Sequence, residues 1–324
     1  MSLCGISKHQ YYHKGKNGKR GVKPSESTVK NTDAGEEQLL LKNEIVVNEI
    51  VQIKSNKDTD YGYQKMTAAL ALLGYCINHK KVYRIMKEQG LLNSKTRCTG
   101  KTRVRFRQVE SKTPLEVLEI DIKYKRISGS GRMAYIMTII DTFTREVLYW
   151  TCGYSMKQVQ VKEAWEYVII HYLQESDTLK KGLKVEVRND NGSQFEAKMV
   201  REFLEENGIT QVFTHPYTPE ENGHIESFHA ILNNSIGNEE YETLQELESR
   251  LKNFYNTYNN IRLHSSICNL PPQVFKLLWE DKLVKMEKGK KYKTKFKLLI
   301  PYYQINKYVS TKKRKKNDHR AMRA

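Results

Sequence analysis

Apolar positions in the first third of the chain recur at the spacing of an α-helix. Residues 36–54 carry this pattern and predict one amphipathic helix. The stretch YGYQKMTAALALLGYCINHKKVYRIMKEQGLL (61–92) predicts two more helices, joined by a turn at Gly74, with the second beginning near Asn78. Together they indicate a small helical domain of the helix-turn-helix type over residues 36–92. A plain helical hairpin with a basic surface is the alternative.

The last of these helices has one apolar and one basic face. Val82, Ile85 and Met86 form a stripe that is expected to point inward. Four basic side chains are expected to point outward, where they would meet DNA phosphates: Lys80, Lys81, Arg84 and Lys87. This basic face is the expected DNA-binding surface of the domain.

From Pro114 onward the pattern changes to strands and then to alternating helices and strands. An antiparallel meander of three strands is predicted at 115–127, 132–143 and 145–154. The elements predicted after it are a helix near 157–175, a strand at 184–189, a helix at 195–207, a strand at 210–215 and helices near 222–236 and 242–260. This order predicts a mixed α/β sheet with helices on both faces, as one domain over residues 114–280.

Three acidic residues occupy unusual positions in this framework. Asp121 lies in the middle of the first predicted strand, on the face opposite its apolar residues. Asp190 directly follows a short apolar strand, where Gly192 allows an unusual turn, and active sites of α/β folds collect at such strand ends. Glu226 lies on the predicted helix near 222–236.

The helix that carries Glu226 is expected to present a polar face to the site. Its start is marked at Thr218 or at Asn222, and either start leaves Glu226 in the first turns. Apolar residues at helical spacing are expected to face the sheet. Glu226, His229 and Asn233 would then lie along the adjoining face.

Carboxylates from three separate elements suit hard divalent cations. Mg²⁺ or Mn²⁺ prefers oxygen ligands, and two such ions held about 4 Å apart stabilise both the attacking and the leaving oxygen of a phosphodiester. Each acid alone would be weak support, since most Asp and Glu residues are solvated surface residues. The joint contexts of Asp121, Asp190 and Glu226 predict catalytic residues that also hold two metal ions.

Charge is divided unevenly along the 324 residues. The net formal charge of +18 results from +12 over residues 1–113, −8 over 114–281 and +14 over 282–324. Basic flanks around an acidic centre fit a protein whose arms neutralise DNA phosphates while its centre holds metal. Solvated lysine-rich surface or a disordered tail is the alternative for any single basic run.

Three basic segments lie outside the two predicted domains. Residues 1–35 are expected to form a flexible N-terminal segment, 93–113 a DNA-contacting linker and 281–324 a lysine-rich C-terminal tail. Within the linker the expected DNA contacts are Arg103, Arg105 and Arg107. The segments predict double-stranded DNA as the partner of this protein.

Other residue patterns exclude several classes of protein. Five scattered cysteines without a Cys-x-x-Cys pair indicate neither a disulfide framework nor a thiolate zinc site. No apolar run approaches the 18 residues of a membrane span and the N-terminus has no apolar signal region, so we expect a cytoplasmic protein without membrane contact. None of the nine histidines has Arg three residues on, as a tyrosine recombinase requires.

Five blocks of the sequence resemble the frame B protein of insertion sequence 3 family transposases and, more distantly, retroviral integrases. The blocks are YGYQKMTAAL with KKVYRIMKEQGLL, LEIDIKY, NDNGSQF, TPEENGHIESFHAILNNS and YNTYNNIRLHSSICNLPPQVF. The 35 residues between Asp190 and Glu226 agree with the spacing in the family's Asp-Asp-Glu motif. The resemblance runs from about residue 3 to 278.

The resemblance implies a ribonuclease H-like fold, divalent metal and a bacterial protein that works on DNA at the nucleoid. In the implied reaction, water cuts at the end of the element and the freed 3′-hydroxyl attacks another phosphodiester, without a covalent protein intermediate. Self-association on DNA and an upstream frame A protein or fusion are the implied partners. Within the last block, Arg262 and His264 are candidate DNA contacts.

The sequence departs from the family at one position of the site. Seven residues after Glu226, where the family usually carries Lys or Arg to grip terminal DNA, this chain has Asn233. Asparagine can hydrogen-bond a base or a phosphate but supplies no charge. Two alternatives to an active transposase therefore stay open: a catalytically inactive DNA-binding remnant, and a metal-dependent nuclease on the same fold.

Overall fold

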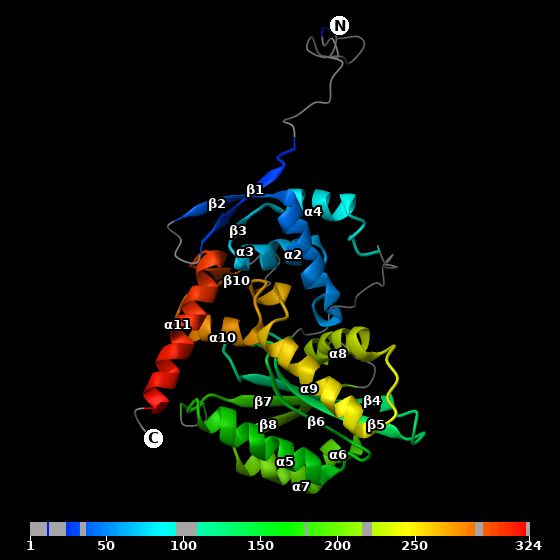
Figure 1. The fold of residues 1–324 in the computed structure, drawn as a ribbon. Coiled ribbons are helices and arrows are strands. Elements are labelled where there is room, and N and C mark those ends of the chain that lie inside the picture. Colours follow the sequence, from blue (N-terminus) through cyan, green and yellow to red (C-terminus); the bar gives the residue numbers. More distant parts are fainter. Residues whose placement is uncertain are drawn as a thin grey trace, which may run out of the picture.

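A central sheet with helices on both faces forms the larger part of the molecule, and a small helical unit lies against one of its helix layers (Figure 1). The structure is a computed structural model that describes Tyr12 and residues 24–32, 37–94, 109–178, 181–215, 222–288 and 294–321. Within these ranges no helix is both long enough and apolar enough to cross a membrane.

The central sheet has five strands in the order β6-β5-β4-β7-β8. The first three strands form the predicted antiparallel meander: β4 (Val117–Arg126), β5 (Met133–Asp141) and β6 (Val147–Gly153). β7 (Val185–Asn189) and β8 (Ile209–Phe213) then add in parallel on the other side of β4. β4 is therefore the middle strand, with an antiparallel neighbour on one side and a parallel neighbour on the other.

Two helix layers cover this sheet. One consists of α5 (Gln158–Val168), the π-helical turn η3 (Ile169–Gln174), the short α6 (Ser193–Glu196) and α7 (Lys198–Glu206). The other consists of α8 (Gly223–Ile236) and α9 (Leu244–Asn260). Each layer buries its own apolar core against the sheet. The mixed α/β fold of the ribonuclease H-like prediction is confirmed.

Side chains along β4 alternate between the two faces of the sheet, so that one face receives apolar residues and the other receives acidic residues. Leu118, Ile120 and Ile122 are buried in the core under α5 and α7, as their period of two predicts. Glu119 and Asp121 therefore point to the opposite face, toward α8. The strand thus anchors one helix layer with apolar side chains and presents carboxylates to the other.

The N-terminal unit combines three helices with a small sheet. Its helices are α2 (Asn43–Ser55), α3 (Tyr63–Leu72) and α4 (His79–Glu88), with the 3-10 turn η2 (Lys57–Thr59) after α2. Its sheet has the order β2-β1-β3, from β1 (Ser27–Asn31), β2 (Gln38–Lys42) and β3 (Tyr75–Cys76). The predicted start of α4 is confirmed, because the Asn78 side chain caps it by accepting a hydrogen bond from the Lys81 N–H.

Two predictions about this part of the chain are wrong. The predicted flexible segment 1–35 includes β1, whose residues pair with both β2 and β3. The predicted helix over 36–54 begins only at Asn43, because β2 precedes it as a strand. The apolar residues of β2 also fit helical spacing, so the local pattern did not reveal the strand, which forms through pairing with β1.

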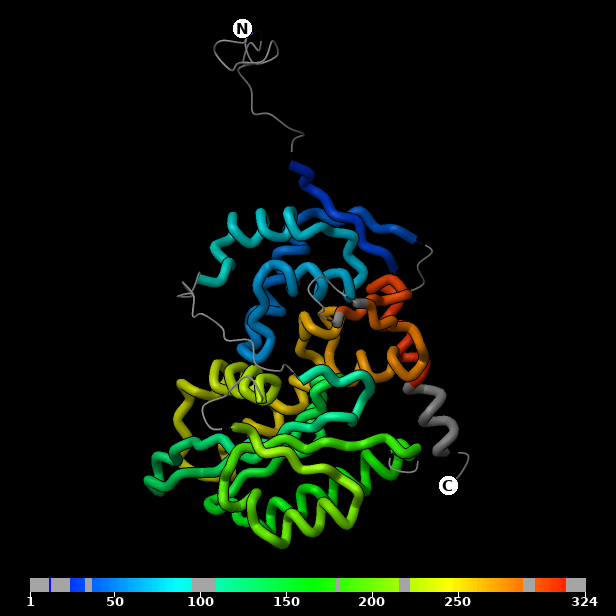
Figure 2. The backbone as a smooth tube through the Cα atoms, turned by 180° about the vertical axis from the view of Figure 1, so that it is seen from behind, coloured from blue at the N-terminus to red at the C-terminus, as the bar shows by residue number. Residues whose placement is uncertain are grey.

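The described residues of the predicted lysine-rich C-terminal tail are folded, which contradicts the alternative of a disordered tail for them. After α10 (Pro272–Glu280), the chain forms a hairpin of β9 (Val284–Lys288) and β10 (Thr294–Leu298) and then α11 (Tyr302–Ala321). The η5 turn (Ser265–Ile267) lies just before α10. Figure 2 shows this segment, in orange and red, between the N-terminal unit and the sheet. Buried apolar residues hold it there.

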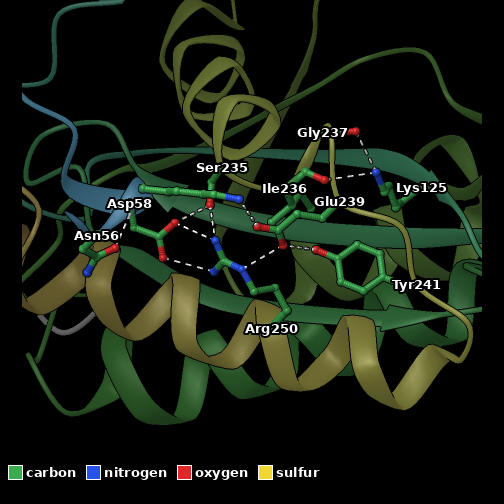
Figure 3. A network of polar contacts seen from close by, with 10 residues as sticks. Asn56, Asp58, Lys125, Ser235, Ile236, Gly237, Glu239, Tyr241 and Arg250 are labelled. Atoms are coloured by element: carbon green, nitrogen blue, oxygen red, sulfur yellow. Dashed lines mark hydrogen bonds and ion pairs between the residues drawn. The ribbon is translucent and has the colours of Figure 1, made fainter. Parts of the chain in front are cut away.

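A network of charged groups joins the N-terminal unit to the core (Figure 3). The Arg250 guanidinium on α9 donates two hydrogen bonds to the Asp58 carboxylate on η2, at 2.7 and 3.1 Å. It also donates to Ser235 on α8 at 2.6 Å and to Glu239 at 3.1 Å. Burial by itself raises the pKa of Asp58, yet the hydrogen bonds from Arg250 and Ser235 hold it below its ordinary value.

A second set of contacts lies beside this ion pair. The Tyr61 hydroxyl accepts a hydrogen bond from the Leu263 N–H at 2.8 Å. The Arg262 guanidinium donates to the backbone carbonyl of Asp58. Leu263 itself is buried among the apolar residues of the N-terminal unit. The segment after α9 therefore belongs to both parts of the molecule, and the N-terminal unit has a fixed orientation on the core.

We expect Arg250→Met to lower the free energy of unfolding by about 3 kcal/mol, because it leaves the buried Asp58 carboxylate without its partner. Adding Asp58→Asn should recover part of this loss. Urea unfolding measures both variants, and Arg201→Met on the exposed side of α7 is the matched control. A loss no larger than that of the control would show that the ion pair contributes little.

Candidate active site

Asp121 lies on the middle strand of the sheet, at the boundary between core and solvent. Its side chain is 29% exposed and faces α8, where His229 Nδ1 lies 3.3 Å from its Oδ2. Its other oxygen accepts a hydrogen bond from the Ile122 N–H at 2.7 Å. The carboxylate is thus held in place, and a substrate can still reach it.

Asp190 comes directly after β7, as predicted, and its Oδ1 accepts a hydrogen bond from the Gly192 N–H at 3.1 Å. Gly192 has an ordinary φ of −66°, so the unusual turn expected there is not formed. An added Cβ would lie 2.5 Å from the Gln194 amide nitrogen and 3.0 Å from Asp190 Oδ1, so a larger residue would make both side chains shift.

The two aspartates come from neighbouring parallel strands at the same level. The paired register of β4 and β7 ends with Glu119 beside Arg188, and each aspartate is two residues further along. Desolvation and then the nearby charge of Asp121 raise the pKa of Asp190, against the hydrogen bond from Gly192. The two carboxylates therefore repel each other across the end of the parallel pair.

The first turn of the helix that carries Glu226 is capped by a residue of strand β4 and not by its own N-cap residue. Asn222 occupies the N-cap position of α8, but its side chain makes no capping hydrogen bond and its Oδ1 is buried without a partner among the described residues. Glu119 of β4 takes that role. Its Oε2 accepts the Ile225 N–H at 2.7 Å, and its Oε1 lies 2.9 Å from His224 Nδ1.

Glu119 is fully buried, and this burial determines its chemistry. Desolvation raises its pKa to about 7, although the Ile225 N–H and the charges of Arg145 and Arg188 act in the opposite direction. The nearby Asp121 adds to the rise. A buried carboxylate two residues before Asp121 thus fixes where α8 starts.

Further contacts hold α8 along the length of β4. His229 reaches Asp121, and Lys125 donates to the carbonyls of Ile236 and Gly237 at 3.0 and 2.9 Å. The predicted inward face of the helix is confirmed, since Ile225, Phe228 and Leu232 are buried. Glu226 lies in the first turn, as predicted, with an exposed side chain.

The side chains of Asp121, Asp190 and Glu226 do not form a cluster of metal ligands in this structure. Within the described ranges, no three His, Cys, Asp or Glu side chains come together closely enough to hold a metal ion. Asp121 and Asp190 do fit one side of such a site, because a cation would relieve their mutual repulsion. Glu226 is exposed one helical turn from His229, which contacts Asp121.

The predicted DNA-binding face of α4 is partly used inside the protein. Lys80 and Lys87 are exposed. Lys81 instead donates to the Ser27 carbonyl of β1, and Arg84 donates to the Ser25 carbonyl at 3.0 Å. Two of the four cations therefore bind the backbone at β1. Lys80 and Lys87 remain as the exposed basic side chains of the predicted DNA-binding face.

Two other predicted DNA contacts are engaged within the protein, the half-buried Arg262 and the buried His264. Arg262 binds the Asp58 carbonyl, and His264 is only 7% exposed, with its ring 4.7 Å from that of Tyr258. Burial, with the charges of Arg262, Lys65 and Arg145, lowers the pKa of His264 to about 3, so the ring is neutral. Both residues stabilise the junction, and we no longer propose them as DNA contacts.

The remaining predicted contacts divide between exposed and undescribed residues. Asn233 is exposed on α8, about two helical turns beyond Glu226. Arg103, Arg105 and Arg107 lie outside the described residues.

Sequence reasoning placed His229 on the face of α8 that adjoins the site, but it missed the roles of Glu119 and His224 at the start of that helix. Only the alternation along β4 hinted at Glu119, because it puts Glu119 and Asp121 on one face.

Comparisons with known proteins match most of the chain. Residues 111–219 and 207–272 each match an integrase core domain, and residues 41–98 match an HTH-like domain. An uncharacterized 39.2 kDa protein of insertion element IS476 from Xanthomonas euvesicatoria is 27% identical over 66% of this chain and 60% of that protein. This chain therefore spans less than two thirds of that relative.

Two further proteins are similar to the chain. The putative transposase InsK of insertion sequence element IS150 from Escherichia coli is 25% identical over 65% of this chain and 76% of that protein. A solved simian T-cell lymphotropic virus intasome in complex with PP2A regulatory subunit B56 gamma is 14% identical over 70% of this chain and 73% of that chain, with a TM-score of 0.42. The domain matches end at residue 272, before the C-terminal hairpin.

We expect Glu119→Ala to loosen the start of α8, because the Ile225 N–H and His224 lose their partner at a cost of about 2 kcal/mol. Hydrogen exchange should become faster in residues 222–228 and stay unchanged in α9. Glu119→Gln keeps an acceptor for the Ile225 N–H and should restore most of the protection. Unchanged exchange at 222–228 in the alanine variant would contradict the capping role.

We expect the buried His264 to make the protein less stable in acid. Its folded pKa of about 3 lies below the ordinary 6.5, so between these values the unfolded chain binds more protons and stability falls with falling pH. The loss from this group between pH 7.5 and pH 5 is about 2 kcal/mol.

The matched variant is His264→Phe, which keeps the ring beside Tyr258 and removes the titration. The raised pKa of Glu119 acts in the opposite direction in both proteins, so their difference isolates the histidine. Urea unfolding at each pH should give a steeper acid loss in the parent than in the variant. Equal slopes would mean that His264 takes up its proton in the folded protein.

Proposed function

We propose that this chain, which belongs to the integrase-core family shared by insertion-element transposases, is a DNA transposase that cleaves the ends of an insertion sequence and joins them to target DNA. Proteins with this core are polynucleotidyl transferases. The match to an HTH-like domain ahead of the core supports DNA as the partner.

One observation carries the proposal. Asp121 and Asp190 meet at the same level of two parallel strands, and the first turn of α8, with Glu226, is held against the same strand by Glu119. Active sites of α/β folds collect at such strand ends. The three acids are proposed as the catalytic residues, and the family match supplies the reaction to which they belong.

The same three carboxylates are the proposed ligands of two Mg²⁺ or Mn²⁺ ions. Bound divalent metal would polarise the phosphodiester and stabilise charge on the attacking and leaving oxygens. The chain itself contributes the positions of the ligands: β4 and β7 fix the two aspartates, and Glu119 and His229 fix the helix that bears Glu226. Their contacts leave the carboxylates of both aspartates partly open to solvent.

Two exposed cations of the N-terminal unit and one polar residue of α8 are the proposed contacts to double-stranded DNA. Lys80 and Lys87 on α4 are free to meet phosphates of a bound duplex. Asn233, on the helix of Glu226, is positioned for a neutral hydrogen bond to terminal DNA. We further propose that the chain self-associates on DNA and acts with an upstream frame A product, as the resemblance to its family suggests.

We expect Asp121→Asn, Asp190→Asn and Glu226→Gln each to lower strand cleavage by at least about 100-fold and to leave DNA affinity within about threefold. The substrate is labelled DNA that spans the flanks of the gene, with Mg²⁺, scored for nicks that leave 3′-hydroxyls and for joined products. Removal of the metal with EDTA should have the same effect as the substitutions.

Glu202→Gln on α7 is the matched control, because it neutralises an exposed carboxylate on the far face of the sheet. Parent-like cleavage by any of the three site variants would remove that residue from the catalytic set. Nicks without joined products would favour a metal-dependent nuclease. DNA binding without any cleavage, even after Asn233→Lys and addition of the upstream product, would favour an inactive remnant.

A further inference from the structure

A large cavity opens beside the first turn of α8. Its lining includes none of the site residues that were predicted from the sequence. Its volume is about 850 Å³. Gly223, His224 and Ser227 of α8 form one wall, next to Glu226. β10, which lies beyond both integrase-core matches, also lines the cavity. The cavity thus joins the candidate active site to the C-terminal hairpin.

We propose that this cavity holds a stretch of DNA backbone next to Glu226, with its phosphates bound by Arg145, Lys295 and Lys297. The proposal rests on the proposed function and adds a binding site to it. It also gives the C-terminal hairpin a role, in place of the predicted lysine-rich tail.

Arg145 supplies a half-buried cation to the lining of the cavity. It lies in the turn between β5 and β6 with a φ of +67°, a left-handed conformation that is rare for a residue with a side chain. Its Nη1 is buried and has no hydrogen-bond partner among the described residues. Because Nη1 is closed to solvent, Arg145 lines the cavity through its other atoms, and the positive charge of its guanidinium favours an anionic oxygen there.

The hairpin supplies two exposed cations in a fixed arrangement. Lys295 and Lys297 alternate along β10, so they lie on one face about 7 Å apart. Phe296 between them packs against Phe143 and Phe275, with ring centroids 5.2 and 4.9 Å away. Because the aromatic cluster fixes the strand to the core, the backbone positions from which the two lysines extend along the cavity are fixed. Lys297 makes a long contact of 3.7 Å to the exposed Glu287.

The rest of the lining fits a nucleic-acid strand better than a small anion. Ser265 and Ser266 offer hydroxyls, which bind phosphate oxygens in protein–DNA complexes. One carboxylate, Glu110, also lines the cavity, so cations outnumber anions by three to one among its Arg, Lys, Asp and Glu residues. A single phosphate would leave most of the volume empty, whereas a strand that passes Glu226 brings several phosphates in succession.

The test uses the full chain in the Asp190→Asn background, so that binding is measured without cleavage. We expect Lys295→Ala with Lys297→Ala to weaken binding of a labelled element-end duplex about tenfold at 100 mM salt. The slope of log affinity against log salt should fall by about two, one unit per lost phosphate contact. Lys198→Ala with Arg201→Ala on α7 removes the same charge from the far face and should change neither quantity.

Crosslinking locates the strand. A photoreactive p-benzoylphenylalanine in place of Ser266 should crosslink to DNA near the cleavage position, and the same group in place of Glu202 should not. Arg145→Gln should reduce the crosslink at Ser266, and 10 mM inorganic phosphate should leave it unchanged. Competition by inorganic phosphate would overturn the proposal in favour of a small-anion site.

The outcomes separate this site from the proposed function. An unchanged salt slope and no crosslink at Ser266, in a chain whose parent form cuts DNA, would overturn the cavity site and leave the transposase standing. A crosslink with the expected slope in a chain that never cuts would support the site on an inactive DNA-binding protein. A chain that binds no DNA would overturn both.

Discussion

A carboxylate in the interior closes the open end of the helix that carries Glu226. The first N–H groups of any helix lack partners within the helix, and in α8 the residue at the cap position does not supply one. Glu119 reaches the helix from β4 and accepts the Ile225 N–H. Because Asp121 lies two residues further along the same strand, one short stretch of β4 sets both a proposed catalytic acid and the start of the helix that bears another.

This arrangement explains why a costly group is kept in the core. Burying a carboxylate is unfavourable, and the raised pKa of Glu119 reflects that cost. An apolar residue would fill the space but leave the helix end without an acceptor. The benefit is positional, since α8 is held at its start by Glu119, in its middle by His229 and at its end by Lys125. Three polar contacts along β4 then determine where the exposed face of α8 lies.

The features that could be predicted from the sequence arise from neighbouring residues. The features that were missed depend on contacts between residues far apart in the sequence. Alternation in β4 and the strand end before Asp190 placed two acids correctly, because those patterns arise within a few residues. Glu119 and Ile225 are 106 residues apart, so no local pattern reveals their bond. The same reason explains the failure at β2, whose apolar residues fit a helix but whose backbone pairs with β1. It also explains His264, whose burial depends on the N-terminal unit and the core together.

The basic and acidic parts of the chain are joined by rigid contacts. The Asp58–Arg250 pair fixes the N-terminal unit on α9, and the cluster around Phe296 fixes the hairpin on the core. The exposed cations Lys80 and Lys295 are therefore carried by elements whose position relative to Asp121 is already set. A DNA duplex that contacts both would need little further ordering of the protein, so less binding energy is lost on association. Such preorganisation also favours chemistry that depends on accurate placement of a phosphodiester. The contacts that hold the domains together thus bear directly on the reaction proposed for the site.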